Sequence, residues 1–312
     1  MKRREFLAAA ATMTAAAHAT IASAHIGGHL DDEGKDMITR KIPSSGEALP
    51  VIGLGTSGPF EVGMEDSARA PLREVLQAFF ASGATVIDTS PMYSTAEAVL
   101  GDLLTPAQQE RAFIATKVWT PKSSGNAATL GVEQMTNSMR LLRRERVELM
   151  QVHNLVDLDA HLATLRRWQD AGKIKYIGIT HFTVASYPQL IDIIQRERLD
   201  FVQFNYSAVT REAEQRLLPL CADKGVAVLV NRAFEDGKLF ERVRGKPVPD
   251  WAEEFDATTW AQVFLKYVLA NPAVTCVIPA TGKLRNMRDN LAAGLGELPD
   301  AAQRARIVAA LA

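Results

Sequence analysis

The stretch Thr85-Val86-Ile87-Asp88-Thr89-Ser90-Pro91-Met92-Tyr93 decides the fold. Val86 and Ile87 belong to an apolar, β-branched run that predicts a buried parallel strand. This strand ends in the carboxylate of Asp88, and Tyr93 follows in the loop before the next helical segment. Parallel α/β proteins place their catalytic groups at the carboxyl ends of strands, so the stretch indicates a functional edge. A strand-ending aspartate that caps a turn, beside a packed tyrosine, is the structural alternative.

The same pattern recurs along the chain, where apolar strand-like runs alternate with segments of helical spacing. The eight runs are Val51–Leu54, Thr85–Ile87, Phe113–Thr116, Leu149–Val152, Tyr176–Ile179, Phe201–Phe204, Ala227–Val230 and Thr275–Ile278. Helical segments are expected near 72–80, 94–104, 128–143, 158–171, 183–197, 211–224, 258–270 and 283–295. This alternation predicts an α/β protein with one (β/α)8 TIM barrel domain over residues 38–312. Residues 38–50 are expected to form a hairpin across the barrel floor, and residues 299–311 a last helix.

The glycine-rich run Gly53-Leu54-Gly55-Thr56-Ser57-Gly58 offers a competing fold. It matches the GxGxxG pattern of doubly wound dinucleotide-binding proteins, in which a helix starts directly at the loop. Here Pro59, Phe60 and Gly63 intervene, and helical periodicity begins only after about Asp66. We therefore favour the barrel, with glycines that let the first strand approach a ligand at the barrel mouth.

Composition excludes several classes of function. The 312 residues carry a formal net charge of −1, with 47% hydrophobic and 23% charged residues. This balance gives no reason to expect binding to nucleic acid or a stable membrane anchor. The two cysteines, Cys221 and Cys276, have no metal or redox spacing, so two buried thiols are expected, with one disulfide as the alternative.

The first 24 residues differ from the rest of the chain. Lys2-Arg3-Arg4-Glu5-Phe6-Leu7 precedes an alanine-rich run, which is typical of a twin-arginine signal peptide. Cleavage after Ala24 is favoured over cleavage after Ala19, and the mature protein is expected to be exported to the periplasm by the export machinery. Residues 25–37 are predicted to form a linker. Its His25, His29, Asp31 and Asp32 fit a solvated tail better than a metal site.

Three further strand runs end in polar side chains that a barrel would bring to the mouth beside Asp88 and Tyr93. Lys117 ends one run, His153 the next, and Thr180-His181 the one after that. An ammonium group near a tyrosine lowers the pKa of the phenol, and a nearby carboxylate keeps that ammonium charged. A histidine can then hydrogen-bond a substrate oxygen. This set predicts a proton donor aimed at a carbonyl that is reduced by hydride.

These four residues, in the contexts IDTSPMY, ATKVW and VHN, resemble the tetrad of the aldo-keto reductase family. The resemblance covers residues 38 to about 296. It implies a (β/α)8 barrel that binds a nicotinamide cofactor, usually NADPH, and reduces aldehydes or ketones. It further implies that Tyr93 is the general acid, that Lys117 and Asp88 tune it, and that His153 orients the carbonyl.

The resemblance also assigns cofactor-binding positions, with departures. Thr180 and His181 stand where the family usually has Ser-Asn gripping the carboxamide, and Gln203 matches the family glutamine. Asn231 replaces a tyrosine that usually stacks on the nicotinamide, so Phe234 or another aromatic would have to take its place. Arg232 can reach the pyrophosphate or pair with Glu235 or Asp236. The remaining expected cofactor contacts nearer the first two strands are Gly55, Thr56 and Asp88.

The last strand-to-helix connection is basic, because Thr281 and Gly282 lead into a helix that carries Lys283, Arg285 and Arg288. Helix N-termini favour anions, which suits the 2′-phosphate of NADPH, with NADH as the alternative. The resemblance implies that Asp289 and Asn290 lie at the adenine. It also places Asn286 where the family often has an arginine. A solvated basic face remains the alternative for the two arginines.

Substrate specificity is expected to come from loops above the barrel. The residues Phe60, Trp119 and Phe182 and the segment 234–256, with Trp251, suggest an apolar pocket for an aldehyde or ketone. An alternative function is a barrel that binds the cofactor but serves as a redox-sensing or partner-binding subunit with little turnover.

Overall fold

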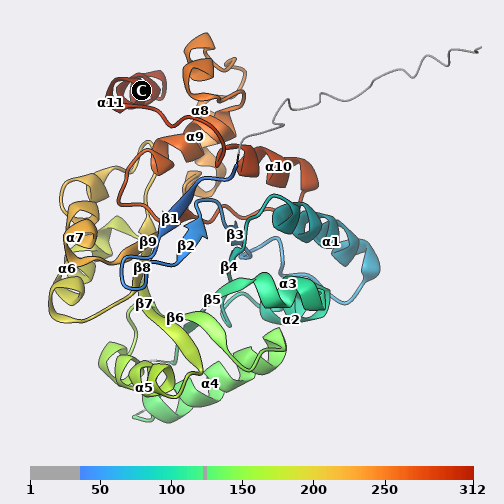
Figure 1. Ribbon diagram of the computed structural model, residues 1–312, viewed down its shortest axis with the longest axis vertical. Coiled ribbons are helices and arrows are strands. Elements are labelled where there is room, and N and C mark those ends of the chain that lie inside the picture. The colour runs from blue at the N-terminus through green and yellow to red at the C-terminus, as the bar shows by residue number, and fades with distance from the viewer. Residues whose placement is uncertain (1–35, 122–124) are drawn as a thin grey trace, which may run out of the picture. The chain divides into compact units, whose positions relative to one another are not determined.

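Eight parallel strands in the described part of the chain form one sheet that curls into a barrel (Figure 1). The computed structural model describes residues 36–121 and 125–312, so the predicted signal peptide and nearly all of the predicted linker lie outside the described residues. The strands are β3 Leu54–Gly55, β4 Val86–Asp88, β5 Phe113–Val118, β6 Val147–His153, β7 Ile174–Thr180, β8 Phe201–Asn205, β9 Ala227–Asn231 and β10 Cys276–Val277. Their order in the sheet follows the chain from β3 to β10.

Residues beside β3 and β10 close the ring. Parallel bridges join Ile52 to Val277 and Gly55 to Ala280. At this seam a Cβ on Gly55 would lie 2.7 Å from the Ile278 carbonyl oxygen, and one on Gly53 would lie 2.8 Å from the Val86 carbonyl oxygen. The glycines therefore permit a close approach between strand backbones, in addition to any ligand.

The helices surround the sheet and confirm the predicted alternation (Figure 1). They are α1 Asp66–Ala81, α2 Ala96–Leu103, α3 Pro106–Arg111, α4 Ala127–Leu142, α5 Leu158–Asp170, α6 Tyr187–Arg196, α7 Leu217–Lys224, α8 Lys238–Arg242, α9 Trp260–Leu269, α10 Leu284–Ala292 and α11 Ala301–Ala310. Short 3-10 turns lie at Val184–Ser186, Glu212–Glu214, Glu235–Gly237 and Asp250–Phe255. Helix α1 begins at Asp66, eight residues after the last glycine of the run ending at Gly58, so the doubly wound alternative is wrong. Among the described residues no helix is long and apolar enough to cross a membrane.

The antiparallel hairpin β1 Thr39–Lys41 and β2 Ala48–Pro50 packs against one end of the barrel interior. Its Ile42 and Leu49 join a buried cluster with inward residues of the strands, among them Phe113, Tyr176 and Phe201. Tyr176 on β7 donates a hydrogen bond to Ser45 at 2.7 Å. The predicted floor is thus present, and the amino-terminal end of the barrel is filled with side chains.

Side-chain alternation along the strands separates this apolar floor from a polar mouth. The inward positions of β5, Phe113 and Ala115, lead to Lys117, just as Leu149 on β6 leads to Gln151 and His153. The same two-residue step brings Asp88, Thr180, Gln203 and Asn231 toward the carboxyl end. The two cysteines are free and buried, as expected. Burial raises the pKa of the Cys221 thiol to about 12 and raises that of the Cys276 thiol too.

Candidate active site

A buried ion pair lies at the centre of the barrel mouth. The Lys117 Nζ atom on β5 lies 2.7 Å from Asp88 Oδ1 on β4 and donates to the Thr89 carbonyl at 2.8 Å. Burial alone would lower the pKa of Lys117, but the charge and hydrogen bond of Asp88 outweigh it and the pKa is raised. Lys117 therefore stays an ammonium ion inside the protein.

Tyr93 lies over this pair, in the loop between β4 and α2. The Lys117 ammonium is 4.8 Å from the centroid of the Tyr93 ring, and both Tyr93 and Asp88 line one cavity. Burial raises the pKa of Tyr93, while the positive charge of Lys117 lowers it in part. The expected net lowering of this pKa is not found, because burial, together with the negative charge of Asp88, outweighs the effect of the lysine charge. The phenol therefore keeps its proton at neutral pH.

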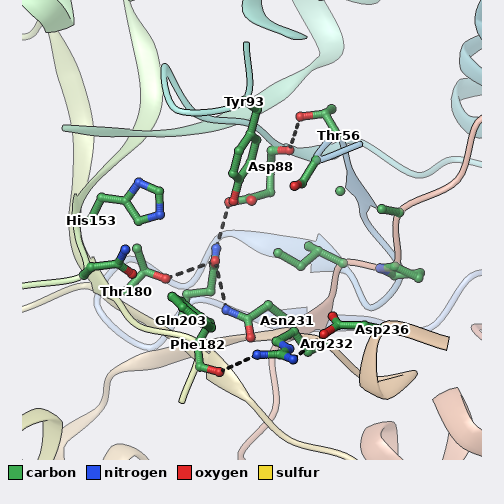
Figure 2. Close-up of a pocket in the computed structure, with 16 residues that line it drawn as sticks. Thr56, Asp88, Tyr93, His153, Thr180, Phe182, Gln203, Asn231, Arg232 and Asp236 are labelled. Atoms are coloured by element: carbon green, nitrogen blue, oxygen red, sulfur yellow. Dashed lines mark hydrogen bonds and ion pairs between the residues drawn. The ribbon is translucent and has the colours of Figure 1, made fainter. Parts of the chain in front are cut away.

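His153, at the end of β6, faces Tyr93 across the cavity, with ring centroids 6.2 Å apart and planes at 88° (Figure 2). Burial and the charge of Lys117 lower the pKa of His153 to about 3, so the imidazole is neutral. Ser90 Oγ lies 3.3 Å from His153 Nδ1 and accepts a hydrogen bond from the Met92 amide. The Ser90 hydrogen is then free for Nδ1, which favours the tautomer that carries its proton on Nε2.

The structure thus brings together all four residues of the predicted tetrad at one cavity, within reach of a small oxygen-bearing molecule. Asp88, Tyr93 and His153 line that cavity directly, and Lys117 lies beneath the first two. The arrangement combines a neutral proton donor, a fixed positive charge and a neutral hydrogen-bond donor around one space. Such a set can stabilise negative charge that develops on an oxygen.

Below Tyr93 and Asp88 in Figure 2, the side chains of Thr180, Gln203 and Asn231 form a hydrogen-bonded row. Gln203 Nε2 donates to Asp88 Oδ2 at 2.7 Å, and Gln203 Oε1 accepts from Thr180 Oγ1 at 3.0 Å and Asn231 Nδ2 at 3.3 Å. Gly55 and Thr56 line the opposite wall, and Thr56 Oγ1 donates to the Asp88 carbonyl at 3.0 Å.

Two adjoining cavities accommodate an elongated ligand. The first, about 460 Å³, contains the tetrad, and the second, about 490 Å³, lies beside α10. Both are lined by Asp236 and Ala280, so they meet at the end of β10. Each has a size found for small-molecule sites. A nicotinamide dinucleotide, with two bases joined by a pyrophosphate, matches this paired shape.

The predicted residues of the α10 region fall into two groups. Thr281, Asp289 and Asn290 line the second cavity, although Asp289 Oδ1 already accepts hydrogen bonds from Thr259 at 2.9 Å and Gln262 at 2.8 Å. Lys283 and Arg285 are exposed at the start of α10 and line neither cavity. They can reach a phosphate only from the solvent side of the helix.

Two predicted cofactor contacts are placed differently. His181 lines neither cavity, because its Nδ1 accepts hydrogen bonds from the backbone amides of Phe182 at 3.0 Å and Thr183 at 3.3 Å. Arg232 lines the first cavity but forms an ion pair with Asp236 and donates to the Phe182 carbonyl at 3.3 Å. Of the two alternatives left open for Arg232, the structure shows the pairing with Asp236.

The expected pocket wall is formed only in part, by Phe182 and by residues of the segment 234–256. Phe60 is buried in the core, Trp119 does not line either cavity, and Trp251 stacks against Arg306. Only Phe182 of the four lines the first cavity, where 44% of its surface is exposed. Phe234 lines the second cavity, with its ring centroid 5.0 Å from that of Phe240. It therefore does not lie beside Asn231, where the stacking aromatic residue was expected.

Several residues of the site were missed from the sequence. Ser90 contacts His153, and Gln151 Nε2 lies 3.4 Å from Asp88 Oδ2. Asn154 and Asp236 line the first cavity. The alternation rule could have found Gln151, because it lies two residues before His153 on the same strand face. Asp236 was expected only as a partner of Arg232 and as part of the segment 234–256, and its position in the cavity had no such signal, since four of the six residues Arg232 to Gly237 have positive φ.

Comparisons with known proteins agree with this geometry. The family model described as "Aldo/keto reductase family" matches residues 51–311. Aldo-keto reductase YhdN of Bacillus subtilis is 27% identical over 219 residues, which is 64% of this chain and 64% of that protein. The match thus spans slightly less than two thirds of the Bacillus relative. Methylglyoxal reductase YeaE of Escherichia coli is 26% identical over 262 residues, or 82% of this chain and 89% of that protein.

Solved structures share the fold. An aldo-keto reductase from Klebsiella pneumoniae, crystallised in complex with NADPH, has a TM-score of 0.68 at 23% identity and covers 87% of this chain and 94% of its own. The holo form of an aldo-keto reductase from Bacillus halodurans has a TM-score of 0.69 at 22% identity, with 88% and 96% covered. Since the family model matches all of the barrel from Val51 onward, the chain belongs to the aldo/keto reductase family of oxidoreductases.

Proposed function

We propose that the protein is an NADPH-dependent reductase that converts aldehydes or ketones to alcohols, with Tyr93 as proton donor. The observation that carries this proposal is the buried Lys117–Asp88 pair beneath Tyr93, with neutral His153 across the cavity. The family and the NADPH named for the Klebsiella structure support the cofactor, and the paired cavities fit it. The exposed Lys283 and Arg285 support a preference for the 2′-phosphate of NADPH over NADH.

When bound, the nicotinamide supplies a hydride to the carbonyl carbon. Side chains of this protein act on the carbonyl oxygen. His153 donates its Nε2 hydrogen to the carbonyl oxygen and remains neutral, since the pKa of its imidazole is about 3. Tyr93 gives its phenolic proton to that oxygen as negative charge develops there, because an alkoxide is far more basic than a phenolate. Lys117 stabilises the phenolate that is left, and Asp88 keeps Lys117 charged.

Substitution of Tyr93→Phe tests the proposal. We expect turnover of methylglyoxal, the substrate named for the Escherichia coli relative, to fall by about 10²–10⁴-fold, the usual contribution of a general acid. Binding of NADPH, followed by fluorescence titration, should be retained. Tyr187→Phe is the matched control, because Tyr187 is a buried tyrosine that bonds the Asn205 carbonyl away from the cavity.

The outcomes separate the candidate functions. Full activity in the Tyr93→Phe variant would exclude Tyr93 as the proton donor. Tight NADPH binding by the unaltered protein with no turnover of any of a panel of aldehydes and ketones would favour the redox-sensing or partner-binding alternative.

We also propose that the protein is exported with its cofactor already bound, on the basis of the Arg3-Arg4 pair and the alanine-rich run after it. The twin-arginine route carries folded proteins, so it would allow loading before export.

A further inference from the structure

Ser90 connects the two residues that face each other across the first cavity. It lies in the loop after β4 and is fully buried. Its carbonyl accepts a hydrogen bond from the Tyr93 amide at 3.0 Å, and its Oγ atom accepts one from the Met92 amide at 3.1 Å. The same Oγ atom lies 3.3 Å from His153 Nδ1. Ser90 therefore holds the backbone that carries Tyr93 and also contacts the ring of His153.

The hydroxyl hydrogen of Ser90 has one acceptor. A serine hydroxyl has a single hydrogen and two lone pairs, and the Met92 amide takes one of the lone pairs. In the part of the chain that the structure describes, His153 Nδ1 is the only acceptor to which this hydroxyl can donate. The hydrogen goes to Nδ1, because a buried O–H group without an acceptor is costly. Nδ1 is then the ring nitrogen without a proton.

The other two protonation states of His153 fit these surroundings less well. With the proton on Nδ1, the ring would donate to Ser90 Oγ and leave the buried hydroxyl hydrogen without an acceptor. With protons on both nitrogens, the ring would carry a charge, which burial and Lys117 oppose by lowering its pKa to about 3. The surroundings therefore select the neutral tautomer with its proton on Nε2.

Nε2 is the ring nitrogen that a ligand can reach. His153 lines the first cavity, and its Nε2 atom, which bonds no residue that the structure describes, is not buried. A carbonyl oxygen only accepts hydrogen bonds, so it needs the form with hydrogen on Nε2. In the other tautomer, the Nε2 lone pair would face the lone pairs of that oxygen and repel it.

We propose that Ser90 is a positioning residue, whose hydroxyl holds His153 in the tautomer that presents its Nε2 hydrogen to the carbonyl oxygen of the substrate. Ser90 lines neither cavity, so it acts on the reaction only through His153. This inference rests on the proposed function, since it needs a carbonyl compound beside His153.

Nuclear magnetic resonance tests the tautomer directly. The histidines are labelled with nitrogen-15, and couplings to the ring protons show which nitrogen of each imidazole carries hydrogen. The His153→Gln variant identifies the His153 signals by their loss. We expect the unaltered protein to carry the proton on Nε2, and Ser90→Ala to populate both tautomers, because Nδ1 then has no fixed partner. Ser90→Thr, which keeps the hydroxyl, should restore the Nε2 form.

Reaction rates show whether the tautomer matters for turnover. Ser90→Ala should lower kcat/KM for methylglyoxal about two- to tenfold, the range for one net neutral hydrogen bond, and should bind NADPH as before. Ser207→Ala is the matched control. Ser207 is also fully buried and accepts from an amide two residues ahead, that of Val209 at 3.2 Å, but its hydroxyl donates to Glu235 at 2.6 Å. This variant should leave the tautomer of His153 unchanged.

The outcomes separate this inference from the proposed function. A proton on Nδ1 in the unaltered protein, or an unchanged tautomer or an unchanged rate in Ser90→Ala, overturns the inference while turnover by the unaltered protein still supports the proposed function. A changed tautomer in Ser207→Ala overturns it as well. No turnover by the unaltered protein overturns the proposed function, and with it any role of Ser90 in the reaction.

Discussion

At the scale of single residues, the site depends on charges that are held inside the protein. Lys117 is wholly buried, yet the carboxylate of Asp88 at 2.7 Å raises its pKa. The same positive charge acts on His153 and, with burial, lowers the pKa of the imidazole to about 3. The positive charge of Lys117 therefore acts on two neighbours, since it adds to the effect of burial on the pKa of His153 and offsets part of the rise in the pKa of Tyr93.

The pKa of His153 predicts a dependence of stability on pH. An imidazole in the unfolded chain has a pKa of about 6.5, so between pH 6.5 and 3 the unfolded state binds the proton and the folded state does not. The free energy of unfolding should thus fall as the pH drops through this window, by at most about 1.4 kcal/mol per pH unit. Urea unfolding at several pH values measures this slope.

Substitution of His153→Gln should make the slope shallower, since glutamine does not titrate. An unchanged slope in this variant would mean that other groups cause it. Because the imidazole stays neutral, turnover should also show no ionisation of His153 near pH 6.5. A limb of the pH–rate profile at that value, absent from His153→Gln, would contradict the proposed role.

The tetrad could be predicted from the sequence because Asp88, Lys117 and His153 lie at or next to the ends of strands, and Tyr93 lies in the loop after the first of these. Alternation could have corrected one assignment, since the inward positions of β7 are Tyr176, Gly178 and Thr180, and His181 lies beyond them. The orientation of the Asn231 side chain could not be predicted from the sequence, because it depends on hydrogen bonds to both Gln203 and the His181 backbone. Tertiary contacts of this kind leave no local sequence pattern.

At the scale of elements, the predicted strands and most helices are confirmed, and the differences have local causes. β3 and β10 each have only two residues, and Pro279, which has no amide hydrogen, cannot donate to the ladder beyond them. The prediction missed the six-residue helix α3, which is too short to show apolar periodicity. Its signal was the sequence Thr105-Pro106-Ala107-Gln108.

This start of α3 is a capping box that can be tested. Thr105 Oγ1 accepts from the Gln108 amide at 3.3 Å, and the Gln108 side chain accepts from the Thr105 amide at 3.0 Å. Substitution of Thr105→Ala should lower the free energy of unfolding by about 1 kcal/mol, the usual cost of a lost cap. Thr105→Ser keeps the hydroxyl and should stay close to the unaltered protein in chemical denaturation. Equal losses in both variants would assign the effect to the methyl group.

At the scale of the whole molecule, the barrel followed from eight repeats of one pattern. The paired cavities did not, because the loop from Arg232 to Gly237 that adjoins both of them has backbone angles no simple pattern predicts. Phe60, Trp119 and Trp251 line neither cavity, and no local pattern in the sequence indicates this.

The proposed export also belongs to this scale, and the Arg3-Arg4 pair gives it a direct test. Replacement of both arginines by lysine keeps the charge and should trap the protein in the cytoplasm if the twin-arginine route is used. Osmotic-shock fractions probed with an antibody report the location. Periplasmic protein from the double variant, or cytoplasmic protein from the unaltered chain, would contradict the proposal.

The hairpin β1–β2 limits the routes by which small molecules can enter and leave the barrel. Its Ile42 and Leu49 fill the amino-terminal end together with the strand side chains, so among the residues that the structure describes the cavity of the tetrad opens on the opposite side. Under the proposed function, this one opening would serve the carbonyl compound, the alcohol and the nucleotide. An alcohol between Tyr93 and His153 and a nucleotide that extends along both cavities would therefore have to leave by the same route.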